Sequence, residues 1–305
     1  VPLLQSFSKV FTTVGPLYFP IPFHKLDGKR DIIGGPSFSA DQTIYKGVSE
    51  DGDHLFVNRV IYNFRNPQRG DIAVFMTHDI LQHDTSLRGQ FYIKRLVGIP
   101  GDILRIRNNK QAFLVDAQGN ETPLSDKHHP AFKKIYSFNA GYHGHTRAYE
   151  KAKPYLIDGD NEIQIRHGGL VMAAFTKDAK GKYTYNTDPI LQQDPDGKFY
   201  WKLHTLVKAD TNTFELHTDN AHVYFKKEGG IYALNSIIHK DGYEARFEEE
   251  YDEYKLGDNQ YFMLGDNSEH SLDSRYWGPV PRKNIIGTAF SVFWPFSHRW
   301  GFADG

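Results

Sequence analysis

Residues 91–102 read FYIKRLVGIPGD, and this stretch decides how the surrounding chain folds. Aromatic and β-branched residues fill its first half, and the turn-forming Pro100-Gly101-Asp102 closes it. This pattern predicts a β-strand over residues 91–97. Strand alternation places Lys94 on the same face as Tyr92 and Leu96, so we expect its amine to point inward. The alternative is a surface lysine on a half-exposed strand.

Short runs of the same kind lie on either side of this stretch. Those expected to be strands cover residues 55–62, 72–75, 261–264 and 285–294. They are rich in β-branched and aromatic residues and are bounded by Gly, Pro and Asp. Helical periodicity is weak, and the best helix candidate is the short acidic segment 247–254.

The composition changes between about residue 103 and residue 259. This region holds more His, Lys, Asp and Asn, with turn signals such as Asp194-Pro195-Asp196-Gly197. Further strand-like runs lie at residues 170–175, 199–207, 222–225 and 231–238. We interpret the region as an inserted domain. The predicted fold is mainly β, with a core of residues 1–102 plus 260–305 and a β-rich inserted domain of residues 103–259.

Composition excludes several classes of function. The chain has 305 residues and a formal net charge of −1, whereas a nucleic-acid partner calls for a basic surplus. It has no cysteine, so disulfides, thiolate catalysis and Cys-ligated metals are excluded. The pairs His128-His129 and His143/His145 are the candidates for a metal site, but they lie in polar stretches. We therefore expect no metal and no cofactor.

The sequence also bears on membrane association. No run reaches the roughly 18 consecutive apolar residues of a membrane span, so no transmembrane anchor is expected within these residues. Aromatic residues make up 14% of the chain and gather towards both ends. They belong either to a sheet core or to a rim at a membrane interface. The residues concerned are Phe19, Phe23, Phe290, Phe293, Trp294, Phe296, Trp300 and Phe302.

Three segments contain candidate catalytic residues. They are GPSFSADQTI at 35–44, the strand at 91–102, and YFMLGDNSEHSLDSRYWG at 261–278. Serine becomes a nucleophile only when a base removes its proton, and lysine serves as that base only when its pKa falls well below its usual value. Burial among apolar groups lowers the pKa of a lysine. Taken singly, Ser39 is a turn residue, and Asp273 with Arg275 is a local ion pair.

Taken together, the segments resemble bacterial type I signal peptidases, which are membrane-bound Ser/Lys proteases. The family's base motif, Y-I-K-R-x-x-G-x-P-G-D, is matched from Tyr92 to Asp102. Its C-terminal motif, G-D-N-x-x-x-S-x-D-S-R-Y-W-G, is matched from Gly265 to Gly278. The strand motif R-G-D-I-V-V-F resembles residues 69–75, and the nucleophile motif S-x-S-M-x-P-T-L is matched in part at residues 37–44.

The resemblance implies a role for each matched residue. It makes Ser39 the nucleophile and Lys94 the base. The oxyanion would be bound by the Ser37 hydroxyl together with the main-chain N–H near Ser39. Ser271 is similar to the residue that orients the lysine amine.

The resemblance also implies supporting and partner interactions. Asp273 and Arg275 are similar to the ion pair that braces the site. The partners would be signal peptides of pre-proteins and the membrane lipid surface. The implied location is the bacterial inner membrane, with the catalytic part on the extracytoplasmic side. The implied fold is a β catalytic core with a second β domain inserted between the lysine and C-terminal motifs.

The sequence departs from the family around the nucleophile. Ala40 replaces the expected Met, and Gln42 replaces the expected Pro. The pocket for the residue before the cut would involve Phe38, Ala40, Val74 and Ile93. These changes leave open a non-cleaving homologue that acts as an assembly factor or chaperone. A separate alternative is a self-cleaving Ser/Lys regulator of the repressor type. The regulator class lacks the long C-terminal motif that this chain has.

Overall fold

The chain divides into two units, residues 1–52 and residues 53–305, each considered by itself. The computed structural model describes residues 8–12, 15–19, 54–78, 80, 89–135, 144–148, 154–167, 170–185, 203–218, 220–266, 271–294 and 301–302. In the first unit, β1 (Ser8–Thr12) pairs with β2 (Gly15–Phe19) in an antiparallel hairpin.

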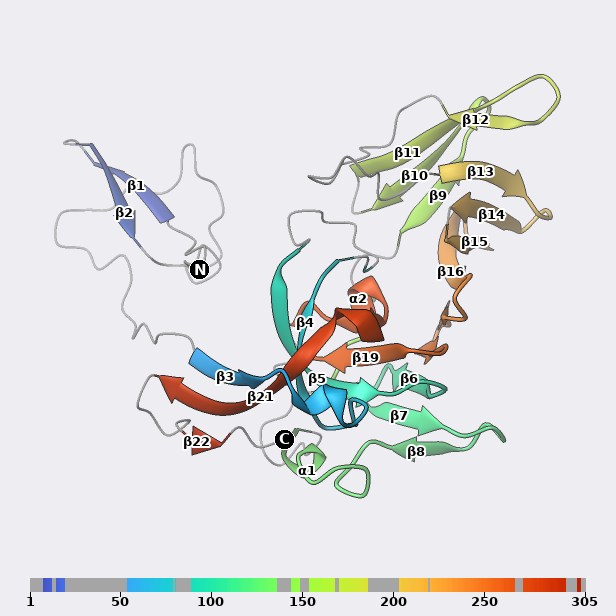
Figure 1. The fold of residues 1–305 in the computed structure, drawn as a ribbon. Helices are drawn as coiled ribbons and strands as arrows, with labels where there is room; N and C mark the ends of the chain where they lie inside the picture. Colours follow the sequence, from blue (N-terminus) through green and yellow to red (C-terminus); the bar gives the residue numbers. More distant parts are fainter. Residues whose placement is uncertain are drawn as a thin grey trace. The chain divides into compact units, whose positions relative to one another are not determined.

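The second unit is built almost entirely from antiparallel strands (Figure 1). Its α-helices among the described residues are α1 (Phe132–Ile135) and α2 (Ser274–Trp277), each about one turn long. The prediction of a mainly β fold is therefore confirmed. In the part of the chain that is described, neither helix has the length to cross a membrane.

A seven-stranded sheet carries the lysine motif. Its strand order is β20-β19-β5-β4-β21-β22, and β3 also pairs with β21. The strands are β3 (His54–Asn58), β4 (Ile72–Met76), β5 (Phe91–Gly98), β19 (Gln260–Leu264), β20 (Val280–Pro281), β21 (Ile285–Trp294) and β22 (Gly301–Phe302). The strands expected near residues 72, 91, 261 and 285 are thus present.

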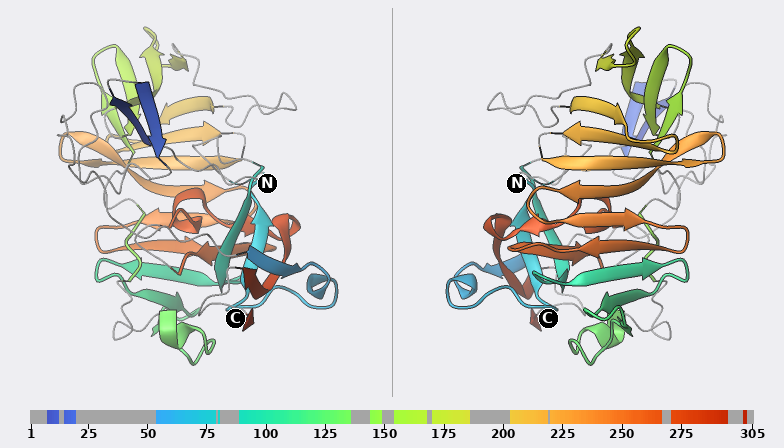
Figure 2. Two further views of the ribbon diagram at one scale, coloured as in Figure 1. Left: turned by 90° about the vertical axis from the view of Figure 1, so that its left-hand side faces the viewer. Right: turned by 90° about the vertical axis from the view of Figure 1, so that its right-hand side faces the viewer.

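A 13-stranded sheet is formed by the residues between β5 and β19. Its main path runs β12-β11-β10-β9-β16-β17-β18-β6-β7-β8, and β13, β14 and β15 join it through β16. Figure 2 shows most of these strands stacked one above another as a long ladder.

Four strands of this sheet overlap the runs expected at residues 170–175, 199–207, 222–225 and 231–238, whereas the sequence predicts no separate run for the other nine. The bounds of all thirteen strands are as follows. They are β6 (Ile103–Arg107), β7 (Ala112–Val115), β8 (Glu121–Pro123), β9 (Tyr155–Asp158), β10 (Glu162–His167), β11 (Leu170–Lys177), β12 (Tyr183–Tyr185), β13 (Leu203–Lys208), β14 (Thr213–Thr218), β15 (Ala221–Glu228), β16 (Ile231–His239), β17 (Glu244–Phe247) and β18 (Tyr251–Lys255). The division into two domains at residues 102 and 260 stays a prediction.

Strand β19 lies between two hydrophobic cores. Tyr261 and Met263 belong to one core, with Leu96 of β5. Phe262 and Leu264 belong to the other, larger core. Because successive side chains of a strand point to opposite faces, a strand buried on both faces is apolar at consecutive positions. This explains the unbroken apolar run of the sequence at β19.

Two expected elements differ in the structure. The run at residues 55–62 is a strand only as far as Asn58, whose side-chain Oδ1 accepts hydrogen bonds from the backbone N–H of Val60 (3.0 Å) and Ile61 (3.1 Å). This turn leads into a 3₁₀ helix, η2 (Ile61–Asn63), because the asparagine offers the backbone a local partner in place of the sheet.

The helix expected at residues 247–254 is wrong. The segment is the end of β17, a turn, and the start of β18, and the backbone N–H of Glu248 donates to the carbonyl of Tyr251 (2.9 Å) across the turn. Asp252 and Tyr254 are buried, whereas Tyr251 and Glu253 are half-buried, which is the two-residue period of a strand.

Candidate active site

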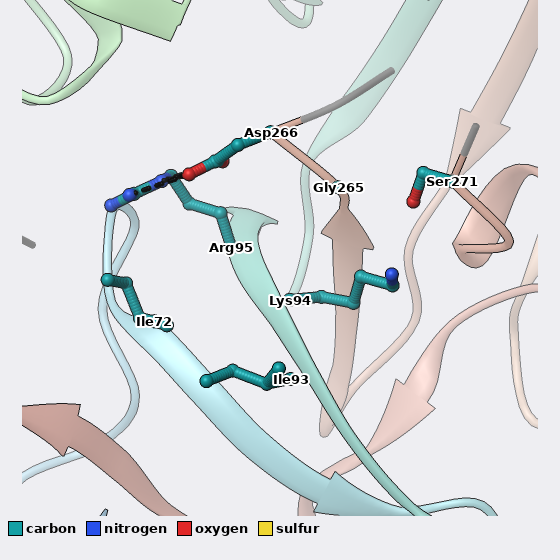
Figure 3. Close-up of a pocket in the computed structure, with 7 residues that line it drawn as sticks. All are labelled: Ile72, Ile93, Lys94, Arg95, Gly265, Asp266 and Ser271. Atoms are coloured by element: carbon teal, nitrogen blue, oxygen red, sulfur yellow. Dashed lines mark hydrogen bonds and ion pairs between the residues drawn. The ribbon is translucent and has the colours of Figure 1, made fainter. Parts of the chain in front are cut away.

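Lys94 lies in the middle of β5, between β4 and β19. Its Cα partner on β4 is Ala73, and the next residue, Arg95, is paired with Leu264 of β19. Lys94 lines a pocket whose other described residues are Ile72, Ile93, Arg95, Gly265, Asp266 and Ser271 (Figure 3). The prediction that the Lys94 side chain is partly withdrawn from solvent agrees with its half-buried position.

The environment of the Lys94 amine favours its neutral form. Burial is the main cause that lowers its pKa; the nearby Asp273 raises it in part, and Arg275 lowers it further. The Nζ atom also lies 5.7 Å from the centre of the Tyr92 ring, on the strand face that the two residues share. A lowered pKa increases the share of neutral amine at a given pH, and the neutral amine is the form that accepts a proton.

Ser271 presents its hydroxyl on the side of the pocket where the Lys94 amine lies (Figure 3). Its Oγ is buried and has no hydrogen-bond partner among the described residues. Gly265 packs against both groups: a β-carbon at Gly265 would lie 2.0 Å from the Ser271 Oγ and 3.6 Å from the Lys94 Nζ. The glycine therefore leaves the space that lets serine and lysine approach each other.

Asp273 and Arg275 form a fully buried ion pair beside this pocket. The Arg275 Nε donates to one Asp273 carboxylate oxygen (2.8 Å), and a terminal guanidinium nitrogen donates to the other (2.9 Å). Burial pushes the pKa of Asp273 upward, but the hydrogen bonds and charge of Arg275 outweigh it and hold the pKa below its usual value. Asp273 also accepts from the backbone N–H of Gly265 (3.1 Å), which ties the pair to the pocket.

Two residues distant in the sequence, His145 and Thr146, also lie beside the ion pair. Arg275 donates to the carbonyl of Thr146 (2.7 Å), and the buried His145 places its Nε2 3.3 Å from the carbonyl of Gly265. Burial, and then the charge of Arg275, lower the pKa of His145 to about 4, so the ring is neutral at physiological pH. The sequence indicates His145 only as a candidate metal ligand, and no local sequence pattern predicts its contact with Gly265.

Further ion pairs hold the ends of the motif strands. Arg95 binds Asp266 (2.9 Å) and donates to the carbonyl of Gly70 (2.8 Å). Arg69 binds Asp102 (2.7 Å), which joins the start of β4 to the turn after β5. The charged residues of these motifs therefore hold β5, on which Lys94 lies, and the residues that follow β19 at Gly265 and Asp266.

Of the residues predicted to form the substrate pocket, the structure describes Val74 and Ile93. Ile93 is 39% exposed, and its partner across the β4–β5 ladder is the half-buried Val74. Ser37, Phe38, Ser39 and Ala40 lie outside the described residues. The structure places Lys94 and Ser271 in one pocket and Asp273 with Arg275 in an ion pair, whereas the roles of these residues and the assignment of Ser39 as nucleophile stay predictions.

Exposed aromatic residues gather on β3 and β21. The Phe56 and Phe293 rings lie 4.5 Å apart between centres, and Phe56 and Phe290 lie 6.1 Å apart. These rings and that of Trp294 are exposed, so they are not part of a buried sheet core. Of the other aromatic residues singled out in the sequence, Phe302 is exposed on β22. The side chains of Phe19, Phe23, Phe296 and Trp300 lie outside the described set.

The chain resembles known proteins over most of its length. The family described as "Signal peptidase, peptidase S26" matches residues 36–176 and 208–294, which is more than half of the chain. Signal peptidase I of Buchnera aphidicola subsp. Baizongia pistaciae is 26% identical over 241 residues, covering 78% of this chain and 59% of the relative. The enzyme of Buchnera aphidicola subsp. Acyrthosiphon pisum is 27% identical over 253 residues, covering 82% and 60%.

A crystal structure of a signal peptidase I from Enterococcus faecalis V583 aligns with a TM-score of 0.28 and 17% identity, covering 73% of this chain and 97% of that one. The chain spans about six-tenths of the length of the two Buchnera relatives. The long family match contains the lysine strand, the Gly265 turn and the buried ion pair described above. The chain therefore belongs to the signal peptidase family, peptidase S26.

Proposed function

We propose that the chain is a serine endopeptidase that cleaves signal peptides from exported pre-proteins. The observation that carries this proposal is the half-buried Lys94, with a lowered pKa, beside a Ser271 hydroxyl that has no hydrogen-bond partner among the described residues. Outside catalysis, a strand lysine gains nothing from burial, because desolvation disfavours its charge. A perturbed pKa in a pocket lined by family motifs is the arrangement that a general base requires.

In the proposed reaction, Ser39 and Lys94 form a catalytic dyad. The neutral Lys94 amine takes the proton of the Ser39 hydroxyl as its oxygen attacks the peptide carbonyl. The backbone N–H of Ser39 and the Ser37 hydroxyl stabilise the oxyanion that forms. Lys94 then gives its proton to the leaving amine, and an ester links Ser39 to the substrate. Water, deprotonated by Lys94, attacks this ester and releases the serine.

We further propose that Ser271 positions the Lys94 amine. Lysine rotates freely about several bonds, so a hydroxyl that accepts or donates one hydrogen bond restricts the direction of its lone pair. Ser271 is itself held by the backbone around the Asp273–Arg275 pair, whose guanidinium lies 3.4 Å from the Ser271 carbonyl. We propose that the ion pair thereby holds the backbone of Ser271 in place and does not contact the substrate.

The substrate is proposed to bind as an extended strand beside the site, because main-chain hydrogen bonds to a strand edge recognise a peptide regardless of most side chains. Small residues before the cut would enter a pocket formed by Phe38, Ala40, Val74 and Ile93. We also propose that residues 103–259 form an inserted domain. The catalytic core would then consist of two segments of the chain, residues 1–102 and 260–305.

The exposed aromatic residues support a location at a membrane surface. Phe56, Phe290 and Phe293 form an exposed apolar patch on two neighbouring strands, and the exposed Trp294 follows Phe293 on β21. Aromatic rings are favoured at the boundary between lipid headgroups and acyl chains. The proposed location is the extracytoplasmic side of the bacterial inner membrane, where exported pre-proteins emerge.

The alternative is a non-cleaving homologue that acts as an assembly factor or chaperone. The observation that favours it is the pair of departures from the family motif, Ala40 and Gln42, next to the proposed nucleophile. The two functions differ in one measurement, which is cleavage of a leader-peptide substrate by the purified chain.

The test compares the natural chain with Ser39→Ala and Lys94→Ala. We expect each variant to lose cleavage with the fold intact, because nucleophile and base act as one unit. Matched controls are Ser236→Ala on β16 and Lys226→Ala on β15, which should keep wild-type rates. Wild-type turnover in Ser39→Ala would overturn the assignment, and no turnover in the natural chain would favour the non-cleaving function.

A further inference from the structure

Four polar side chains gather on one face of the β14–β15 hairpin. His217 is directly opposite His222 in the antiparallel ladder, and Glu215 is opposite Tyr224. Residues two apart on a strand share a face, so Glu215 with His217, and His222 with Tyr224, point to the same side. The ladder thus brings two imidazoles, a carboxylate and a phenol together.

The imidazoles of this cluster converge on one carboxylate oxygen. His222 Nδ1 lies 2.7 Å from Glu215 Oε1, and His217 Nε2 lies 2.8 Å from the same oxygen. The two rings are stacked, with centres 4.2 Å apart and an angle of 17° between their planes. The three ligand atoms all lie within 4.8 Å of one another, which is close enough for them to share one ion.

Hydrogen bonding does not satisfy the whole cluster. The Nε2 of His217 is shielded from solvent and, although close to Glu215, makes no hydrogen bond of good geometry with any described residue. Oε1 of Glu215 also accepts from the Tyr224 hydroxyl (3.1 Å), so several groups compete for one oxygen. A shielded polar atom with no partner costs free energy, and a shared cation would remove that cost.

We propose that Glu215, His217 and His222 bind a divalent transition-metal ion of the Zn²⁺ class. Two imidazole nitrogens and one carboxylate form a donor set that Zn²⁺ accepts, with a fourth position left for water. Tyr224 is the residue that orients the carboxylate, as second-shell partners of metal ligands do. Among the described residues this is the place where three such ligand atoms converge.

The ligands come from two adjacent strands, so the ion would bridge β14 and β15. These strands belong to the 13-stranded sheet, whereas Lys94 belongs to the seven-stranded sheet. The ion would therefore stabilise the β14–β15 hairpin. Its affinity should fall at acid pH, because protonated imidazoles cannot bind a metal.

Calorimetric titration of the metal-stripped full chain with ZnCl₂ tests the proposal. We expect one equivalent to bind the natural chain, and His217→Gln and His222→Gln each to bind at least about 100-fold more weakly, since even outer-shell changes cost about 10–100-fold. Tyr224→Phe should weaken binding by about tenfold. The matched control is His239→Gln, because His239, on β16 of the same sheet, pairs with one acidic residue among those described, Asp241 (2.7 Å).

A second measurement guards against variants that fail to fold. Zn²⁺ should raise the melting temperature of the natural chain and of His239→Gln, because a ligand that binds the folded state stabilises it. It should leave the melting temperatures of Glu215→Gln and His222→Gln unchanged, and circular dichroism of these variants without metal should match the natural chain. Equal Zn²⁺ affinity in every variant, or no binding to the natural chain, would overturn the assignment.

Discussion

Gly265 and Ser271 are packed so closely that any side chain at residue 265 would collide with the Ser271 hydroxyl. A β-carbon there would lie 2.0 Å from Oγ and 2.5 Å from the Ser271 Cβ. The carbonyl of Gly265 faces His145, and its N–H is bound by Asp273, so the backbone is held on both sides. The glycine cannot move away from the serine without breaking these contacts.

Replacing Gly265 therefore tests whether Ser271 positions the lysine. Gly265→Ala should displace Ser271 and lower kcat by about 100-fold, because a misplacement of about 1 Å can cost that much. Overpacking should also destabilise the fold by about 1–3 kcal/mol. Cleavage kinetics and thermal melting measure the two effects. Gly230→Ala is the matched control, since a β-carbon there meets nothing within 4 Å. Unchanged kinetics in Gly265→Ala would mean that Ser271 does not position Lys94.

The pH dependence of cleavage follows from the lowered pKa of Lys94. Only the neutral amine accepts a proton, so kcat/KM should rise with pH as Lys94 loses its charge. The rise should level off well below about pH 10.4, the value for free lysine, because burial disfavours the charged form. A pH–rate profile measures this. A rate that still climbs at about pH 10 without a plateau would show that the working amine is not desolvated.

Removing the acidic member of the buried ion pair should damage stability and activity together. Asp273→Ala leaves the Arg275 guanidinium without a counter-charge in a buried site, and we expect a loss of about 3–5 kcal/mol in the free energy of unfolding. Chemical denaturation and cleavage rates measure the effect. Glu244→Ala is the control, because its pair with Lys255 (3.4 Å) is partly exposed to solvent and should contribute about 0–1 kcal/mol. A wild-type melting curve for Asp273→Ala would contradict the prediction.

The aromatic patch on β3 and β21 should bind lipid. Phe56→Ser and Phe293→Ser each remove one ring of the closest pair in the patch, so co-sedimentation with anionic liposomes should fall in both variants. Phe64→Ser is the matched control, because Phe64 is 81% exposed but lies outside the patch. Equal sedimentation of the natural chain and all variants, with no blue shift of tryptophan fluorescence, would assign the patch another role.

Substrate preference should differ from that of a typical leader peptidase. In the family, a methionine after the nucleophile keeps the pocket shallow and favours Ala, whereas this chain has the smaller Ala40. Side chains larger than Ala, such as Ser, Cys or Val, should be tolerated, because one methylene in an apolar pocket is worth about 1–3 kcal/mol. A peptide library varied at that position, compared between the natural chain and Ala40→Met, measures the preference. Profiles dominated by Ala in both proteins would show that residue 40 does not determine the depth of the pocket.

The sequence predicted the strands better than it predicted the contacts between distant segments. The apolar run of β5 was sufficient to place Lys94 on a strand, and the C-terminal motif placed Asp273 near Arg275. The helix expected at residues 247–254 failed because Phe247, Tyr251 and Tyr254 have helical spacing, although they lie on two strands around a tight turn. The contact of His145 with Gly265 spans 120 residues and involves a backbone carbonyl, so no side-chain pattern records it.

The pairing of β5 with β19 has a consequence for the order in which the protein is made. Strand β5, which carries Lys94, ends at Gly98. Its partner on one side, β4, precedes it, but its partner on the other side, β19, begins only at Gln260, after the whole 13-stranded sheet has been synthesised. At about 5–20 residues per second this interval lasts on the order of ten seconds or more. During that time one edge of β5 is open to pairing with other chains, and Lys94 has neither Gly265 nor Ser271 beside it. Under the proposed mechanism, a nascent chain should therefore not cleave peptides until ribosomes have passed the C-terminal motif.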